Sequence, residues 1–287
     1  MELYQLAYFI AVAEHRNFTR AAERLHLAQP ALSQQMKNLE SELGAPLFVR
    51  SRKATVLTQA GEVLLAKARN LLADATAAKQ AVADVANLKR GKLVLAAIPS
   101  ISGRWLPPAL RRFRQAYPQI ELILKEGSSD EVSTMIDTAQ AEIGFLQFPT
   151  DNKRFAAGLI LSEAFVVLLP RSHDLARSRA ISLTQLADEP FVLYKGKAKE
   201  VVLNTCRDLG FEPTVACESG ELETVRSLVA AHLGVAVLPE LAVQSVGKTL
   251  VVQSLKKPRL ARKLGWIHRR DAAPSSAAQA FLDTIAS

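Results

Sequence analysis

The first part of the chain shows three short amphipathic stretches separated by turn residues. Apolar residues recur every three to four positions over 3–15, which predicts a helix. Thr19 is a suitable N-cap for a second, short helix, and 26–28 reads as a tight turn. A third helix has Pro30 in its first turn, where the missing N–H is tolerated, and ends at Gly44. This order predicts a helix-turn-helix, whose last helix enters the major groove of DNA.

The outward face of the third helix is polar and nearly uncharged. Its apolar positions, which are expected to pack inward, are Leu32, Met36, Leu39 and Leu43. The opposite face carries glutamine, serine, asparagine and one lysine, Lys37. These side chains can hydrogen-bond base edges, whereas an ordinary solvated face would be rich in glutamate and lysine. We therefore expect this face to read DNA sequence.

A basic hairpin follows the third helix. Residues 47–57 read as two short strands around a tip that carries Arg50, Arg52 and Lys53. Three cations within four positions can straddle phosphates, or they can enter a narrow minor groove, where the negative potential favours arginine. A solvated basic turn is the simpler alternative. Beside the three helices, the hairpin is typical of the wing of a winged helix-turn-helix.

Residues 2–64 resemble the DNA-binding domain of LysR-type transcriptional regulators. The resemblance is carried by Phe18-Thr19-Arg20-Ala21-Ala22-Glu23-Arg24-Leu25, Gln29-Pro30-Ala31-Leu32-Ser33, Leu39-Glu40-Ser41-Glu42-Leu43-Gly44, Leu47-Phe48-Val49-Arg50 and Leu57-Thr58-Gln59-Ala60-Gly61. It implies groove-reading positions on the third helix and phosphate contacts on the wing. With Lys37 added from the helix face, the expected DNA contacts are Gln29, Pro30, Ser33, Gln34, Lys37, Arg50, Arg52 and Lys53. Relatives often have arginine where Gln34 stands, so we expect a different preferred base there.

An alanine- and leucine-rich stretch follows over 58–88. It has no proline and a single glycine, Gly61, so we expect one long helix. A seven-residue repeat runs through Leu64, Leu71, Ala78 and Val85, with Ala68, Ala75 and Val82 offset by four. Such a seam of small residues is typical of two closely packed helices, and packing onto its own chain is the alternative. The family resemblance favours a dimer contact, which implies an operator with inverted symmetry.

Beyond residue 92 the pattern changes to short apolar strands that alternate with amphipathic helices. Strands are expected at 93–98, 120–125, 142–147, 161–169, 191–194, 215–218, 235–238, 250–253 and 264–268, and helices at 106–117, 131–139, 201–209, 221–231 and 277–285. This alternation predicts parallel sheets built from βαβ units. So many elements suit two small α/β lobes better than one sheet, and the chain should cross between the lobes at 161–166 and 264–269.

Two loops of this second module place serines at predicted helix starts. Ser100 and Ser102 follow the first strand, and Ser128 and Ser129 follow the second. Ligands of open α/β sheets bind beyond the carboxyl ends of strands, where helix N-termini offer free N–H groups. These donors favour an anionic or strongly hydrogen-bonding small molecule, while simple helix capping is the alternative reading of each loop.

The second module also resembles the effector-binding domain of the same family, which is similar in fold to periplasmic binding proteins. The resemblance implies a cleft between two lobes, lined by the two serine loops, by 146–148 and by 194–198. The expected effector contacts are Ser100, Ser102, Ser128, Ser129, Gln147, Tyr194 and Lys197. Relatives that sense aromatic carboxylates often have arginine where Gln147 stands, which argues against that kind of effector. Nearby lysines could supply positive charge instead, although they are also typical of a solvated loop.

Composition fits a globular protein with an acidic partner. The chain has 287 residues, is 49% hydrophobic and carries a formal net charge of +8, which favours nucleic acid as the partner. The longest apolar stretch, 164–169, is too short to span a bilayer, and the first residues lack the charged start of a secretory signal. We therefore expect a cytoplasmic protein without a membrane partner. The same observations argue against a secreted solute-binding protein.

The sequence carries no complete enzyme motif that we recognise. Gly247-Lys248-Thr249 has the end of a phosphate-binding loop, but Ala242 stands where that loop requires glycine. The five histidines are scattered, and Cys206 and Cys217 lack the spacing of a metal or C-x-x-C site, so no cofactor is expected. The two cysteines leave a redox-responsive regulator as the alternative function, because the family has a peroxide-sensing branch.

The predicted fold is a multidomain α/β protein. A winged helix-turn-helix is expected over 1–58, a linker helix over 59–89 and an effector domain over 90–287. Within the effector domain we expect lobe I over about 90–163 and 268–287 and lobe II over about 164–267. The predicted function is sequence-specific transcriptional regulation controlled by a small molecule. The expected partners are double-stranded DNA, further copies of the chain in a homodimer or homotetramer, and RNA polymerase as an additional candidate.

Overall fold

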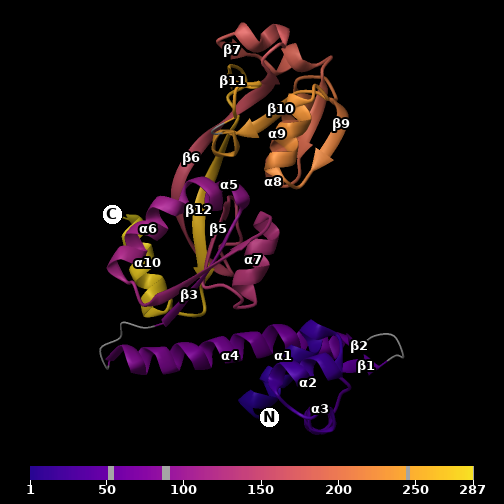
Figure 1. The fold of residues 1–287 in the computed structure, drawn as a ribbon, viewed down its shortest axis with the longest axis vertical. Coiled ribbons are helices and arrows are strands. Elements are labelled where there is room, and N and C mark those ends of the chain that lie inside the picture. The colour runs from indigo at the N-terminus through magenta and orange to yellow at the C-terminus, as the bar shows by residue number, and fades with distance from the viewer. Residues whose placement is uncertain (51–54, 86–90, 244–245, 287) are drawn as a thin grey trace.

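A computed structural model describes residues 1–50, 55–85, 91–243 and 246–286. The chain forms an amino-terminal module, a linker helix and two lobes, and Figure 1 shows the lobes stacked on one side of the linker helix. The amino-terminal module consists of α1 (Leu3–His15), α2 (Phe18–Leu25), α3 (Gln29–Leu43), β1 (Phe48–Arg50) and β2 (Thr55–Leu57). The strands β1 and β2 are antiparallel, which confirms the predicted helix-turn-helix and its wing strands. The wing tip with Arg52 and Lys53, and the side chain of Arg50, lie outside the described residues.

Aromatic contacts join the wing to the helices of this module. The ring of Phe48 at the start of β1 lies 5.3 Å from that of Phe9 and 5.6 Å from that of Phe18, centroid to centroid. All three rings are buried. Such offset and edge-to-face pairs stabilise the packing beyond their buried area. The wing therefore shares its core with the three helices.

The helix ends of this module follow local sequence signals, with two corrections. The N-cap of α2 is Asn17, whose side-chain oxygen accepts hydrogen bonds from the backbone N–H of Thr19 at 2.8 Å and of Arg20 at 3.1 Å. The prediction of Thr19 as the N-cap was wrong because α2 begins at Phe18, two residues earlier than that cap implies, so Thr19 already lies inside the helix. Gly44 ends α3 with φ +68°, as predicted. Leu43, expected to pack inward, is 40% exposed because it lies in the last turn, beyond the core.

The linker helix α4 (Gln59–Val85) matches the predicted long helix. It packs on α1 of its own chain through Leu64, Leu65, Ala68 and Leu72, and Ala68 is fully buried. Two positions of the predicted seam are thus occupied within the chain, as in the alternative interpretation. Leu71 is 44% exposed and faces away from this contact. The side chains of Val82 and Val85 lie outside the described residues.

Lobe I is a five-stranded mixed sheet with helices around it. Its strands are β3 (Gly91–Ala97), β4 (Ile120–Glu126), β5 (Ile143–Gln147), β12 (Ala261–Arg269) and the first part of β6 (Phe155–Pro170), in the order β4-β3-β5-β12-β6. Its helices are α5 (Pro99–Arg104), α6 (Leu106–Ala116), α7 (Ser129–Asp137) and α10 (Ser276–Ala286). The rings of Phe113, Phe145 and Phe281 meet edge to face in its core. This core fixes the strand ends that face lobe II.

Lobe II is built around the second part of β6. Its other strands are β7 (Ala180–Ile181), β8 (Pro190–Tyr194), β9 (Thr214–Ser219), β10 (Ala236–Pro239) and β11 (Leu250–Leu255), and its helices are α8 (Lys197–Asp208) and α9 (Leu222–Ala230). Three short 3-10 turns complete it, η1 (Asp174–Arg177), η2 (Leu183–Leu186) and η3 (Glu240–Ala242). The short elements α5 and β7 were not predicted, because neither is long enough to show a hydrophobic period.

The sheets are mixed and not parallel throughout, which corrects the prediction. β3 pairs in parallel with β4 and β5, and β8 pairs in parallel with β9. β12 is antiparallel to both β5 and β6, and β10 and β11 are antiparallel to β6. Periodicity reports strand positions and not strand directions, so it could not distinguish these arrangements.

Both lobes share β6, a strand of 16 residues. Its first part pairs with β12 as far as Ala164, and from Phe165 onward it pairs with β10 and β11. The first crossing therefore lies within the predicted 161–166. The second crossing was placed wrongly at 264–269. Because β12 pairs with β5 along 264–267, this strand belongs to lobe I, and the chain returns before residue 261.

The cap assignment yields a stability prediction. Asn17→Ala removes the acceptor for two N–H groups at the start of α2, so it should lower the free energy of unfolding of the amino-terminal module by about 1 kcal/mol. Thr19→Ala is the matched control and should change it much less. Denaturant titration, with amide hydrogen exchange at residues 19 and 20, measures both effects. Equal losses for the two variants would contradict the assignment of Asn17 as the cap.

Candidate nucleic-acid interface and effector cleft

The third helix presents the predicted contact residues on one exposed face. The side chains of Gln29, Pro30, Gln34 and Lys37 are exposed, and Ser33 is half-buried. The Gln29 amide donates to the Ser33 hydroxyl at 2.8 Å, and the Gln34 amide donates to Asn38 Oδ1 at 2.9 Å. A glutamine amide has two donor hydrogens and an acceptor oxygen. Each glutamine is therefore oriented by a neighbour one turn away and keeps polar atoms for a base edge.

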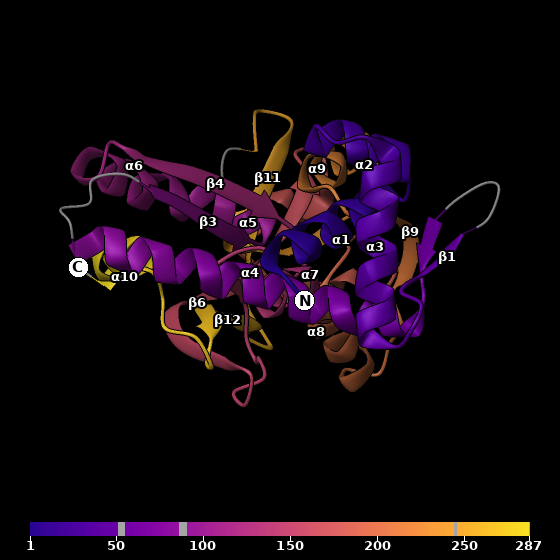
Figure 2. The same ribbon diagram turned by 90° about the horizontal axis from the view of Figure 1, so that it is seen from below.

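Glu40 connects the reading helix to the wing. Its Oε1 accepts hydrogen bonds from the backbone N–H of Leu47 at 2.8 Å and of Phe48 at 3.2 Å. The backbone N–H of Thr55 at the start of β2 donates to the carbonyl of Arg16 at 3.2 Å. Figure 2 shows α3 and β1 beside one another at the same end of α4. Sequence reasoning missed Glu40, because an acidic residue late in a helix resembles an ordinary solvated side chain.

The four predicted serines are engaged in bonds within the protein. Ser100, Ser102 and Ser129 are buried. The Ser100 hydroxyl accepts from Arg262 Nη2 at 2.7 Å, Ser102 donates to Pro99 and Glu126, and Ser129 Oγ accepts from the Gln147 N–H at 3.3 Å. Ser128 forms a capping box with Glu131 at the start of α7. For Ser128 the capping interpretation therefore applies, and the hydroxyls of the other three serines bond to partners within lobe I.

An inter-lobe cavity of 680 Å³ lies between the loops at 126–131 and 194–200. It contains Ser128, Ser129, Tyr194 and Lys197 from the predicted set, whereas Ser100, Ser102 and Gln147 do not line it. Burial raises the pKa of the Tyr194 hydroxyl, which keeps this group a neutral hydrogen-bond donor. The volume suits a small metabolite.

Charges of both signs face this cavity. Its acidic side chains are Glu126, Asp130, Glu131, Glu200 and Glu221, and its basic ones are Lys195, Lys197 and Lys199. Lys197 Nζ of lobe II lies 3.1 Å from a carboxylate oxygen of Asp130 in lobe I, so this ion pair bridges the lobes. Lys199 pairs with Glu218 at 3.0 Å within lobe II. The cavity wall is therefore more acidic than the serine loops alone suggested.

A buried ion pair stands at the strand crossing, and sequence reasoning missed it. Glu163 of β6 and Arg262 of β12 bond through Oε1 and Nε at 2.7 Å, and both side chains are almost fully buried. Arg262 also donates to Ser100 Oγ and, at 3.3 Å, to Gln147 Oε1, both in lobe I. The second oxygen of Glu163 accepts from the backbone N–H of Leu241 at 2.7 Å, just beyond β10 of lobe II.

Arg262 places a buried guanidinium within hydrogen-bond distance of Gln147, but it does not line the inter-lobe cavity. Burial lowers the pKa of Arg262, and the charge and hydrogen bond of Glu163 oppose that shift. Glu163 therefore stabilises the charged form of the buried guanidinium. A carboxylate inside a predicted crossing strand was the only sequence signal for this pair. Since Glu163 and Arg262 are 99 residues apart, no local pattern could join them.

The two cysteines are not joined by a disulfide in the structure. Both are free, Cys206 is fully buried in the core of lobe II, and Cys217 on β9 is half-buried. Burial raises the pKa of the Cys206 thiol to about 11. Because the thiolate is the reactive form, this environment opposes oxidation of Cys206 at neutral pH.

Within the described residues, no three or more His, Cys, Asp or Glu side chains gather in a way that could hold a metal ion. No described helix combines the length and apolarity needed to cross a membrane.

Two family models cover nearly the whole chain. Residues 3–62 match the bacterial regulatory helix-turn-helix protein, lysR family, and residues 86–287 match the LysR substrate binding domain. The chain belongs to the LysR family. It is thus a DNA-binding transcriptional regulator with an amino-terminal helix-turn-helix and a carboxyl-terminal effector-binding domain, as predicted.

Several LysR-family regulators are similar to this chain over most of its length and of their own. The regulator AlsR of Bacillus subtilis is 33% identical over 84% of this chain and 82% of its own, and BudR of Raoultella terrigena is 36% identical over 84% and 85%. Full-length OxyR from Pseudomonas aeruginosa superposes with a TM-score of 0.79 at 28% identity, covering 99% of this chain and 94% of that one. CbnR in complex with its target DNA superposes with a TM-score of 0.74 at 26% identity, covering 100% of this chain and 99% of that one. Proteins of this family are transcriptional regulators and generally not enzymes.

The ion pair at the strand crossing gives a second prediction. Arg262→Met leaves the Glu163 carboxylate buried without its counter-ion, so it should destabilise the effector domain by about 3–5 kcal/mol. The double variant Glu163→Leu, Arg262→Met removes both charges and should recover most of this loss. Denaturant unfolding followed by circular dichroism measures the cycle. A double variant as unstable as the sum of the two single variants would mean that the residues do not act as a pair.

Proposed function

We propose that this LysR-family regulator reads an inverted-repeat operator with α3 and its wing, and that a small molecule bound in the inter-lobe cavity controls it. The observation that carries the DNA half is the exposed, polar and weakly charged face of α3 next to a basic wing. The observation that carries the effector half is a 680 Å³ cavity whose two walls come from different lobes. Closure of such a cavity by ligand changes the relative position of the lobes.

The proposed DNA contacts divide into two roles. Gln29, Ser33 and Gln34 contact base edges in the major groove, with Pro30 fixing the start of the helix. Lys37 and the wing residues Arg50, Arg52 and Lys53 supply contacts to phosphates or to the minor groove. The hydrogen bonds of Gln29 and Gln34 to neighbours on the helix support this division, because they pre-orient the two amides.

The functional unit is proposed to be a homodimer or a homotetramer. Val63 and Leu71 of α4 are 63% and 44% exposed. A second copy of the helix packed against them would bury this apolar surface, whose exposure to water is unfavourable. Two reading heads in one assembly match an inverted-repeat operator. A regulator of this kind acts on the chromosome, which supports the cytoplasmic location.

The mixed charge of the inter-lobe cavity refines the effector class. An anionic group fits Lys195 and Lys197, as expected from the sequence, but Asp130 already neutralises Lys197 at 3.1 Å. A second, cationic group on the effector would fit the carboxylates of Glu126 and Glu221 in the same cavity. A small zwitterionic metabolite therefore suits this lining better than a simple anion. The redox alternative is disfavoured by the buried Cys206 thiol.

The DNA-reading roles predict different effects for two substitutions. Gln34→Ala should reduce the discrimination between the operator and a mutated operator by about 1–3 kcal/mol, because a base-edge contact is lost. Lys53→Ala should weaken binding to all sequences and flatten its salt dependence, because a phosphate contact is lost. Titrations of labelled duplexes at several salt concentrations measure both. If Gln34→Ala weakens operator and random DNA equally, the base-reading role is wrong.

The effector cavity predicts opposite effects for the two partners of the Lys197–Asp130 pair. Asp130→Ala frees Lys197 and should strengthen the binding of a ligand with an anionic group, whereas Lys197→Ala should weaken it. The measurement is the thermal stabilisation of the full chain by a panel of zwitterionic and anionic metabolites. Stabilisation that neither variant changes would place the effector elsewhere. A chain that regulates its promoter without any ligand would contradict the effector half and leave the DNA half intact.

A further inference from the structure

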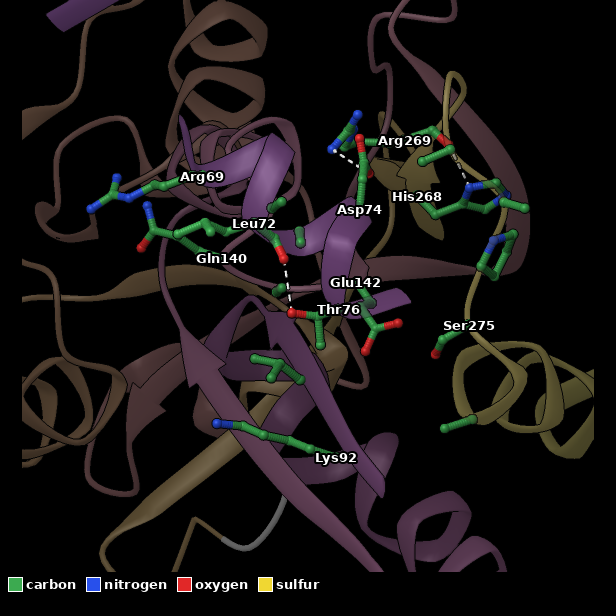
Figure 3. A pocket seen from close by; sticks show the side chains of 18 of the residues that line it. Arg69, Leu72, Asp74, Thr76, Lys92, Gln140, Glu142, His268, Arg269 and Ser275 are labelled. Atoms are coloured by element: carbon green, nitrogen blue, oxygen red, sulfur yellow. Dashed lines mark hydrogen bonds and ion pairs between the residues drawn. The ribbon is translucent and has the colours of Figure 1, made fainter. Parts of the chain in front are cut away.

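A second cavity, of 490 Å³, lies between the linker helix and lobe I (Figure 3). One wall comes from the end of α1 and from residues 69–76 of α4. The other comes from the start of β3, from 139–142, from the end of β12 and from the loop before α10. We call it the linker cavity. None of its lining residues belongs to the lining of the inter-lobe cavity, so the two cavities are separate sites.

The wall of the linker cavity is mainly apolar and built from small side chains. Its apolar residues are Ile10, Leu72, Ala73, Val94, Ala139, Ala141, Ala272, Ala273, Pro274 and Ala277. Alanines on both sides leave the space between two backbones unfilled. A hollow of this size and character can bury a small apolar molecule. The binding free energy becomes more favourable with the area of apolar surface that the ligand and the wall remove from water.

Two ion pairs account for four of the charged groups around this hollow. Arg69 pairs with Glu14 at 2.8 Å, within the amino-terminal module. Arg269 of β12 lies 3.7 Å from Asp74 of α4, so this pair joins lobe I to the linker helix. These carboxylates are already neutralised and offer little to a charged ligand.

Glu142 is different from the other acidic side chains of the lining. It is half-buried, and among the described residues it forms no ion pair. Burial raises the pKa of Glu142, while hydrogen bonds from Ser275 partly oppose the shift. Figure 3 shows the Glu142 carboxylate next to Ser275, with the ammonium group of Lys92 pointing away from it. Among the described residues, the carboxylate therefore has no ion-pair partner on the side that faces the cavity.

We propose that the linker cavity binds a small apolar amine, with its ammonium group at Glu142 and its apolar body on the alanine walls. The cation restores the electrostatic stabilisation that burial removes from the carboxylate. A carboxylate ligand would instead meet the like charge of Glu142. The site is distinct from the inter-lobe cavity, and the proposal stands or falls independently of the effector proposed there.

Such a ligand would contact the DNA-binding module and lobe I at once. Within the described residues, the Asp74–Arg269 pair is the ion pair that joins α4 to lobe I. An amine held between them would add buried contacts that exist only in this arrangement of the two modules. By favouring one arrangement it would shift the population of module orientations.

The test uses the full-length chain and 2-phenylethylamine as the probe, with phenylacetate as the size-matched anion, in isothermal titration calorimetry. We expect the amine to bind once per chain and phenylacetate not to bind in this cavity. Glu142→Gln keeps an acceptor for Ser275 but removes the charge, so it should weaken the amine by about tenfold or more. Ala73→Phe fills the hollow and should abolish binding, whereas Ala116→Phe, at an exposed position on α6, should not.

Two further measurements separate this site from the inter-lobe cavity. Lys197→Ala, which alters only the inter-lobe cavity, should leave amine binding unchanged. Saturating amine should protect residues 69–76 and 139–142 from amide hydrogen exchange. Amine binding that Glu142→Gln leaves unchanged, equal binding of phenylacetate, or protection at 126–131 and 194–200 instead would each overturn the proposal. The exchange data and Glu142→Gln decide the question even if Ala73→Phe does not fold.

Discussion

The ion pair between Glu163 and Arg262 determines how the two lobes are held, because each partner also bonds to a different lobe. Arg262 holds Ser100 and Gln147 in lobe I, while Glu163 holds the backbone N–H of Leu241 beside lobe II. A buried charge without its partner is strongly destabilising, so neither residue can move alone. The pair therefore moves as a unit at the point where β6 passes from one lobe to the other. The walls of the inter-lobe cavity take their relative position from this point.

The sequence predicted the modules of the chain well, but it did not predict the ion pair at the strand crossing. Helices and strands appear as local hydrophobic periods, which is why the three amino-terminal helices, the linker helix and the nine main strands were found near their observed positions. The Glu163–Arg262 pair joins two strands 99 residues apart, and each residue alone resembles a charge on an alternating strand. Strand direction is equally invisible to periodicity, so the antiparallel return of β12 and the lobe boundary before residue 261 were missed.

The candidate site divides in the same way. Gln29, Gln34 and Lys37 were predicted from the face of a single helix, and the structure exposes all three. The serine loops were found at the correct strand ends, but the hydroxyl of Ser100 is held by Arg262, and Ser128 by its own helix start. A serine at a loop cannot reveal from sequence whether its partner is a ligand or another residue. Only the tertiary contacts decide between these roles.

The packing of α4 against α1 has a mechanical consequence for DNA. Because Ala68 is fully buried between these helices, the reading head and the linker helix form one stiff unit without a joint between them. In a dimer, the distance between two recognition helices is then set by the contact between the linker helices. Half-sites whose spacing does not match that distance can be engaged together only if the duplex bends or twists. The sequence between the half-sites, which the protein need not touch, then contributes to recognition through its stiffness.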